Sequence, residues 1–114
     1  MSKEEGKVIL LSSEGCSGDD ADLGFEVLVK LLEALPERED RPVAIICWNT
    51  AVRLLAEGSP LLARFKRLEE KGVNVLAGKL CVSELGLTDK IAAGKPATMN
   101  EILDIVLHHE VISL

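Results

Sequence analysis

Cys81 is the side chain with the clearest chemical potential in this sequence. It follows a strand-like run, Val73–Ala77, and opens a short helical segment, Cys81–Leu85. A thiol placed where a strand gives way to a helix lies near free N-terminal amides, which stabilise a thiolate. Lys79 adds a positive charge that favours the same form, whereas Glu84 opposes it. The alternative interpretation is a small buried hydrophobe, which is the usual role of a single intracellular cysteine.

The other two cysteines carry weaker signals. Cys16 lies in a polar, glycine-bearing loop, either as a second thiol for exchange with Cys81 or as a solvent-exposed bystander. Cys47 lies inside an apolar run typical of a buried strand, so we interpret it as a core residue. Three widely spaced cysteines make a poor disulfide framework, and their spacing matches no metal motif. We therefore expect any thiol chemistry to involve single residues, with no metal and no cofactor.

The loop that ends at Gly18, Asp19 and Asp20 precedes the first predicted helix, so phosphate binding at its N-terminus has to be considered. The loop has neither of the common glycine-rich phosphate motifs, and its carboxylates repel an anion. A magnesium site built from these carboxylates lacks the further acid expected at the end of a later strand. The simpler prediction is that Asp19 or Asp20 caps a helix that runs to about Leu35.

Apolar runs typical of buried strands alternate with amphipathic segments along the whole chain. The capping box Thr98–Glu101 starts the last helix, whose final turn holds His108 and His109, and Gly94–Pro96 is predicted to form a turn. This order predicts a single α/β domain over residues 1–114, a three-layer α/β/α sandwich with a flavodoxin-like parallel sheet of four to five strands. The predicted strands are 7–12, 43–48, 73–77 and 111–114, and the predicted helices are 20–35, 51–57, 59–71 and 99–109.

The predicted strand order would create a crevice at the carboxyl edge of the sheet. In a flavodoxin-like sheet the loops after the first and third strands are neighbours, and ligands bind where they meet. The turn after the second strand, which begins at Asn49, opens at the same edge. The predicted crevice comprises Cys16, Gly18, Asp19, Asp20, Asn49, Lys79 and Cys81.

Charge and hydropathy exclude several classes of partner. The net charge is -6 and basic residues are interleaved with acids, as in Arg64–Lys71, so we expect no nucleic acid. No apolar stretch approaches the length of a membrane span, so we expect no membrane partner. The N-terminal residues lack the pattern of an export signal, and we therefore expect a cytoplasmic protein.

The helix Leu23–Leu35 is unusually apolar. Its polar residues Glu26, Lys30 and Glu33 form one narrow stripe, and the remaining positions are mostly large and hydrophobic. Such a helix is either covered on two sides or part of a subunit interface. We expect a homo-oligomer, a dimer, trimer or hexamer, that forms through this helix.

Several short segments, taken together in their order and spacing, form a recognisable pattern that runs nearly end to end. They are Gly18–Asp20 with Leu23–Gly24, Asn49–Leu54 with Glu57–Ser59, Leu68–Val73, Cys81 with Gly86–Lys90, and Ala93–Gly94 with Thr98–Ile102. This pattern resembles the DsrE/DsrF-like sulfur-relay family, and most closely the DsrE-like domain of YedF-type proteins linked to sulfur or selenium metabolism. The resemblance implies that Cys81 receives a persulfide sulfur from a sulfur-donor protein and passes it to a sulfur-acceptor protein, and that the chain forms oligomers.

The chain departs from the YedF-like pattern at one position. Those domains usually have Cys-Gly-Thr-Cys where this sequence has Gly78–Cys81, so the first thiol is missing. The resemblance therefore implies a sulfurtransferase-like carrier with a single cysteine. The alternative hypothesis is a non-catalytic binding or assembly module that uses the same crevice for a small ligand or a protein partner.

Overall fold

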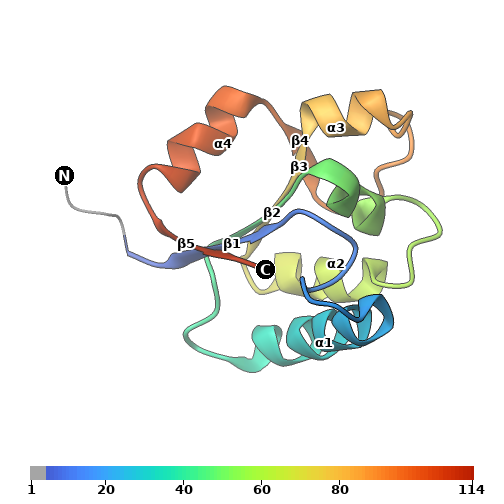
Figure 1. The fold of residues 1–114 in the computed structure, drawn as a ribbon. Coiled ribbons are helices and arrows are strands. Elements are labelled where there is room, and N and C mark those ends of the chain that lie inside the picture. The colour runs from blue at the N-terminus through green and yellow to red at the C-terminus, as the bar shows by residue number, and fades with distance from the viewer. Residues whose placement is uncertain (1–4) are drawn as a thin grey trace.

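A five-stranded parallel sheet forms the centre of the computed structural model, which describes residues 5–114 (Figure 1). Its order is β4-β3-β2-β1-β5, so each of the first four strands lies beside the next one along the chain. All neighbouring strands are parallel, with Leu11 level with Cys47 and Cys47 level with Ala77. The strands are β1 Lys7–Leu11, β2 Ala44–Cys47, β3 Asn74–Gly78, β4 Lys95–Ala97 and β5 Glu110–Ser113.

Helices cover both faces of the sheet. In Figure 1, α1 and α2 lie together on one face and α4 lies on the other. Two short elements, η2 and α3, contact each other at the carboxyl ends of β2 and β3. The helices are α1 Ala21–Ala34, η1 Leu35–Glu37, η2 Asn49–Leu55, α2 Leu62–Glu70, α3 Lys79–Glu84 and α4 Met99–Val106, where η1 and η2 are 3-10 helices.

The core has two parts because successive side chains of a strand point to opposite faces. Ile45 points to the side of α1 and α2, where Leu28 and Phe65 are fully buried. Ile46 points to the other side, where Ile102 of α4 covers it. The apolar runs of the inner strands are therefore explained by burial on both faces, and β2 is buried at every position.

The predicted fold class is confirmed: the chain is a three-layer α/β/α sandwich with a flavodoxin-like parallel sheet. One inference drawn from the expected strand order is wrong. Because β2 lies between β1 and β3, the loops that follow β1 and β3 are not neighbours. The strand order instead reverses at β1, because β2, β3 and β4 follow on one side of β1 and β5 lies on its other side.

Two local predictions also differ from the structure. The predicted turn at Gly94–Pro96 contains the start of a short strand, β4, which pairs with β3. Pro96 is tolerated because β4 lies at the edge of the sheet, where a missing N–H breaks no ladder. The helix expected over 51–57 is a 3-10 helix that begins earlier, at Asn49.

No helix among residues 5–114 is long and apolar enough to cross a membrane. The prediction that the N-terminus lacks an export signal depends partly on residues 1–4, which lie outside the described residues.

Candidate functional site

The thiol of Cys81 lies against the turn that follows the neighbouring strand β2. The backbone N–H of Asn49 donates a hydrogen bond to Sγ of Cys81, with 3.0 Å between nitrogen and sulfur. Asn49 has a φ of 53°, and within residues 5–114 it is the only residue other than glycine with a positive φ. Asparagine is among the few side chains that adopt this left-handed conformation readily. The sharp turn at Asn49 therefore directs an amide at the sulfur.

Gly78, the last residue of β3, leaves room beside the same sulfur. A Cβ atom at Gly78 would lie 3.6 Å from Sγ of Cys81 and only 3.2 Å from Cβ of Trp48. Trp48 is held in place by its indole N–H, which donates to Oγ of Ser12 over 2.9 Å. The ends of β2 and β3 thus approach each other closely, and the absent side chain at Gly78 allows it.

The segment around Cys81 is half open to solvent. Cys81 is half-buried against the core, and the next residue, Val82, is fully buried. Leu80, on the other side, is 66% exposed. Hence Cys81 lies at the boundary between the core and the surface.

Lys79 is exposed at the start of α3, and its positive charge affects Glu101 of α4. The pKa of the Glu101 carboxyl is lowered, chiefly by the hydrogen bond from the backbone N–H of Thr98, and Lys79 and Lys95 contribute further. The charge of Lys79 therefore has a small effect on Glu101, and the hydrogen bond at Thr98 is the main cause.

Cys16 occupies a different part of the carboxyl edge. Its backbone N–H donates to the carbonyl oxygen of Gly24 over 3.0 Å. A Cβ at Gly24 would come within 2.3 Å of the Cys16 carbonyl oxygen, so the loop can lie this close to α1 only because residue 24 is glycine. Cys16 is half-buried there, and this burial raises the pKa of its thiol.

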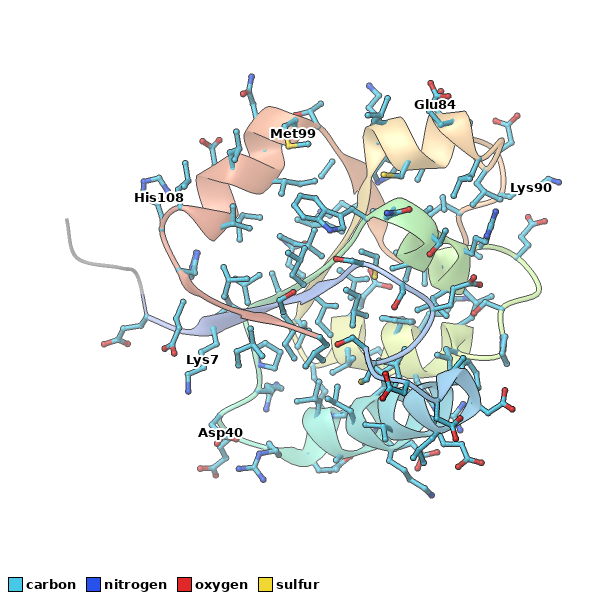
Figure 2. The ribbon with its side chains drawn as sticks, viewed as in Figure 1. Lys7, Asp40, Glu84, Lys90, Met99 and His108 are labelled. Atoms are coloured by element: carbon cyan, nitrogen blue, oxygen red, sulfur yellow. The ribbon has the colours of Figure 1, made fainter. Side chains whose placement is uncertain are left out.

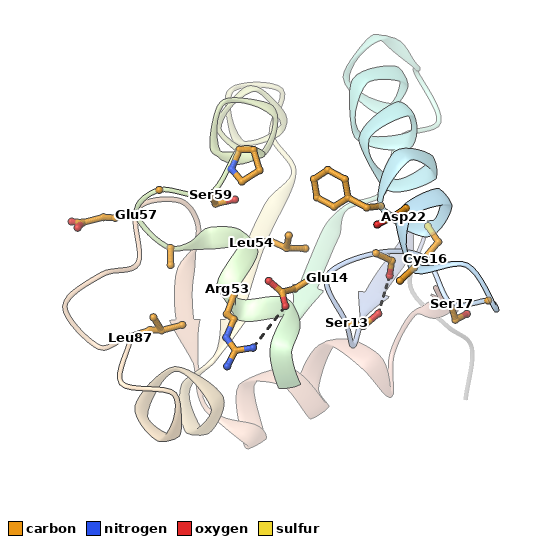
Figure 3. Close-up of a pocket in the computed structure, with 17 residues that line it drawn as sticks. Ser13, Glu14, Cys16, Ser17, Asp22, Arg53, Leu54, Glu57, Ser59 and Leu87 are labelled. Atoms are coloured by element: carbon orange, nitrogen blue, oxygen red, sulfur yellow. Dashed lines mark hydrogen bonds and ion pairs between the residues drawn. The ribbon is translucent and has the colours of Figure 1, made fainter.

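The loop that holds Cys16 forms one wall of an open pocket of about 840 Å³ (Figure 3). The opposite wall is η2 and the segment that follows it. Arg53 of η2 and Glu14 of the loop form an ion pair across the pocket, with 3.7 Å between Nη1 and Oε2. Phe25, Leu54 and Leu87 supply apolar surface. The pocket has the size of a small-molecule site and lies at the carboxyl edge of a parallel sheet.

The structure divides the predicted crevice into two places. In one place Cys81 is in contact with Asn49. In the other, Cys16 and Gly18 line the pocket. None of Cys81, Asn49 and Lys79 lines that pocket. Since two strand spacings separate β1 from β3, the loop ends are roughly 10 Å apart. The expected juxtaposition of Cys16 with Cys81 through adjacent strands is therefore corrected by the position of β2.

The two aspartates at the end of the first loop, Asp19 and Asp20, do not face the pocket. Oδ1 of Asp20 accepts the backbone N–H of Leu23 over 3.0 Å, which confirms the predicted cap of α1. Asp19 is exposed and is not part of the pocket lining. Among residues 5–114 no group of three or more His, Cys, Asp or Glu side chains is arranged to hold a metal ion.

Cys47 was predicted correctly from the sequence, whereas Arg53 was missed. Cys47 is fully buried in β2 as predicted, and burial raises the pKa of its thiol to about 12. Arg53 was not among the predicted site residues. Its position four residues after Asn49, in the turn that follows a buried strand, is the signal that points to it.

Comparison with known proteins defines the fold class. No family model matches the sequence, and no curated protein matches it. Solved structures do match over 96% of this chain, with low sequence identity. A conserved protein of unknown function from Bacteroides thetaiotaomicron is 19% identical, with 95% of its chain covered and a TM-score of 0.70.

Two further structures match over their whole length. The ychN protein from E. coli is 15% identical, with a TM-score of 0.67. A protein of unknown function from Methanobacterium thermoautotrophicum is 14% identical, with a TM-score of 0.69. The match covers the full length of both of these known structures. The present chain therefore shares its fold with these proteins.

Proposed function

We propose that this protein is a sulfur carrier that holds a persulfide on Cys81, receiving sulfur from a donor protein and passing it to an acceptor protein. The observation that carries the proposal is the hydrogen bond from the Asn49 N–H to Sγ of Cys81. This backbone donor holds the sulfur in place and points at it, so it can stabilise the negative charge that the sulfur carries in the transition state of attack or departure. The resemblance to the DsrE/DsrF-like family supports the same residue and the same chemistry.

The other two thiols are less suited to this role. Cys47 is buried on all sides, and its raised pKa keeps the thiol protonated. The pKa of Cys16 is also raised by burial, and a thiol reacts as the thiolate. Cys81 alone combines partial exposure with a backbone donor on its sulfur.

The transfer requires no oxidant or reductant. The Cys81 thiolate attacks the outer sulfur of the donor persulfide, forms a new sulfur–sulfur bond, and releases the donor thiolate. In the second half, an acceptor thiolate attacks the outer sulfur now held on Cys81, and Cys81 leaves as a thiolate. One sulfur atom moves in each step, and the oxidation level of the pair of reactants is unchanged.

Intact-mass spectrometry after incubation with glutathione persulfide tests the loading step. The wild type is expected to gain about 32 Da, the mass of one sulfur atom, reversibly with dithiothreitol. Cys81→Ala is expected to lose the adduct, and Cys16→Ala serves as the matched control that keeps it. An adduct that survives in Cys81→Ala, or no adduct on the wild type, would contradict the proposal.

The pocket of about 840 Å³ favours a second candidate, a binding module without sulfur chemistry. Within residues 5–114 the guanidinium of Arg53 forms a single ion pair, with Glu14 at 3.7 Å, so it has donors left for the polar group of a small ligand whose apolar part contacts Phe25. A melting-temperature screen of small carboxylates and amines tests this function. Two results together would support the binding function. A ligand raises the melting temperature of the wild type but not of Arg53→Ala, and Cys81 of the wild type takes up no sulfur from glutathione persulfide.

A further inference from the structure

The turn that carries Asn49 is anchored by a side chain of β1's carboxyl end. Trp48, the residue before Asn49, donates its indole N–H to Oγ of Ser12 over 2.9 Å, although the two residues are 36 positions apart in the chain. Within residues 5–114 no side chain other than that of Ser12 hydrogen-bonds to Trp48. An indole N–H is a donor only, and when it is partly buried it needs an acceptor in the protein. The hydroxyl of Ser12 therefore fixes the orientation of the Trp48 ring.

Trp48 connects this anchor to the ends of three strands. Its backbone N–H donates to the carbonyl oxygen of Leu11 over 3.0 Å, and its own carbonyl oxygen accepts the N–H of Ala51 over 3.2 Å. Its Cβ lies against the end of β3, only 3.2 Å from the position that a Cβ on Gly78 would take. Side chains fill the space between the sheet and the helices around it (Figure 2). A shift of the Trp48 ring is therefore transmitted to the backbone of its neighbour, Asn49.

The conformation of Asn49 depends on such support. A φ of 53° is sparsely populated for a residue with a side chain, and it persists only where the surrounding structure holds it. This conformation directs the N–H of Asn49 at Sγ of Cys81, with 3.0 Å between nitrogen and sulfur. Because a hydrogen bond weakens steeply as it bends, a small rotation of the peptide between Trp48 and Asn49 reduces the interaction. The direction of the N–H is thus as important as its distance from the sulfur.

We infer that Ser12 is a positioning residue for the Cys81 thiol: its hydroxyl fixes the indole of Trp48 and so keeps the N–H of Asn49 directed at the sulfur. Its part in sulfur transfer rests on the function proposed above, whereas its effect on the reactivity of the thiol does not. Without the hydroxyl, the indole N–H has to turn toward water. Attack by the Cys81 sulfur is then expected to slow about three- to tenfold, less than the roughly hundredfold loss that follows removal of a preorganised donor.

The rate at which iodoacetamide alkylates Cys81 tests the inference without any sulfur donor. All proteins carry Cys16→Ala, and Cys47 is fully buried, so intact mass follows Cys81 alone. Ser12→Ala is expected to react about three- to tenfold more slowly than the parent, and Ser12→Thr, which restores a hydroxyl, should recover most of the rate. Trp48→Phe removes the same hydrogen bond from its other end. The two losses are expected not to add when Ser12→Ala and Trp48→Phe are combined.

Two control variants separate the direction of the N–H from general stability. Thr98→Ala removes a cap hydrogen bond at the start of α4. Ser113→Ala repeats the serine-to-alanine change at an exposed position of β5, the strand beside β1. Both are expected to react at the parent rate, and urea unfolding of each variant compares their stability with that of Ser12→Ala.

Loading of the same variants with glutathione persulfide distinguishes a failure of this inference from a failure of the sulfur-carrier proposal. Slower alkylation and slower loading in Ser12→Ala support both. Slower alkylation with no sulfur adduct on any protein supports the positioning role of Ser12 and contradicts the carrier function. The inference is overturned if Ser12→Ala is alkylated at the parent rate, if the losses in the double variant add, or if Thr98→Ala slows the reaction equally, whatever the loading experiment shows.

Discussion

The backbone N–H of Asn49 donates a hydrogen bond to Sγ of Cys81 although the two residues are 32 positions apart in the chain. The contact depends on the left-handed conformation of Asn49, whose φ is 53°. A β-branched side chain in this conformation costs roughly 1–2 kcal/mol, whereas glycine adopts it freely. Asn49→Val is therefore expected to displace the turn and to slow sulfur loading of Cys81, while Asn49→Gly keeps a rate close to that of the wild type.

The measurement is the rate of loading with glutathione persulfide, followed by intact mass, for the three proteins under native conditions. Unfolding by urea for each variant separates a general loss of stability from a local effect at the sulfur. Equal loading rates for Asn49→Val and Asn49→Gly would mean that the turn does not serve the thiol.

Gly78→Cys converts the proposed single-thiol carrier into a site with two thiols. A Cβ at Gly78 lies 3.6 Å from Sγ of Cys81, close enough for a disulfide after a small shift. The introduced thiol is expected to attack the Cys81 persulfide at its inner sulfur, forming a disulfide with Cys81 and releasing hydrogen sulfide. The variant should therefore hold no stable adduct, and sulfide should appear in solution.

Gly78→Ala is the matched control for this experiment. It adds the same Cβ, which lies 3.2 Å from Cβ of Trp48, but supplies no thiol. It is expected to retain the adduct. If Gly78→Cys kept its persulfide as long as Gly78→Ala does, the geometry given for the two positions would be wrong.

Thr98→Ala removes one half of the capping box at the start of α4. Oγ1 of Thr98 accepts the backbone N–H of Glu101 over 3.2 Å, and a carboxylate oxygen of Glu101 accepts the N–H of Thr98 over 2.9 Å. Loss of an N-cap side chain costs about 1 kcal/mol. The free energy of unfolding, measured with urea, is expected to fall by about this amount, and Thr98→Ser should recover most of it. An unchanged value for Thr98→Ala would show that α4 does not depend on its cap.

Cys47 makes the folded protein sensitive to alkali. Burial raises the pKa of its thiol from 9.0 to about 12. A raised pKa means that the unfolded chain loses this proton first, so the contribution to stability is present below pH 9.0 and is lost as the pH rises toward 12. Cys47→Val, which is similar in size and has no proton to lose, should decline less over this range.

The free energy of unfolding of both proteins is measured with urea at two pH values, one just below 9.0 and one halfway between 9.0 and 12. The stability of the wild type relative to Cys47→Val is expected to decrease between the two conditions. A constant difference would indicate that the Cys47 thiol ionises equally in the folded and unfolded states.

The sequence predicts those features that depend on local chemistry. The cap at Asp20 and the capping box at Thr98 are confirmed by their hydrogen bonds, because a cap is formed by residues three positions apart. The burial of Cys47 and the parallel sheet follow from continuous apolar runs in the sequence. Pro96 led to an error, since only the position of β4 at the sheet edge explains how a proline fits there.

Features that depend on long-range arrangement could not be read from local patterns. The position of β2 between β1 and β3 is decided by how all strands and helices pack, and it separates Cys16 from the Cys81 segment. The contact between Asn49 and Cys81 depends on this same order, which places β2 next to β3. The sequence identified both residues as site candidates but not their hydrogen bond.

Transfer of sulfur from Cys81 to a second thiol tests the central claim most directly. The protein is loaded with glutathione persulfide, freed of excess donor, and mixed with a cysteine-containing acceptor peptide. Mass spectrometry then follows sulfur on both molecules. We predict that the adduct of about 32 Da leaves Cys81 and appears on the peptide in equal amount, and that Cys81→Ala transfers none. Transfer that continues in Cys81→Ala, or a loaded Cys81 whose sulfur never reaches the peptide, would contradict the account.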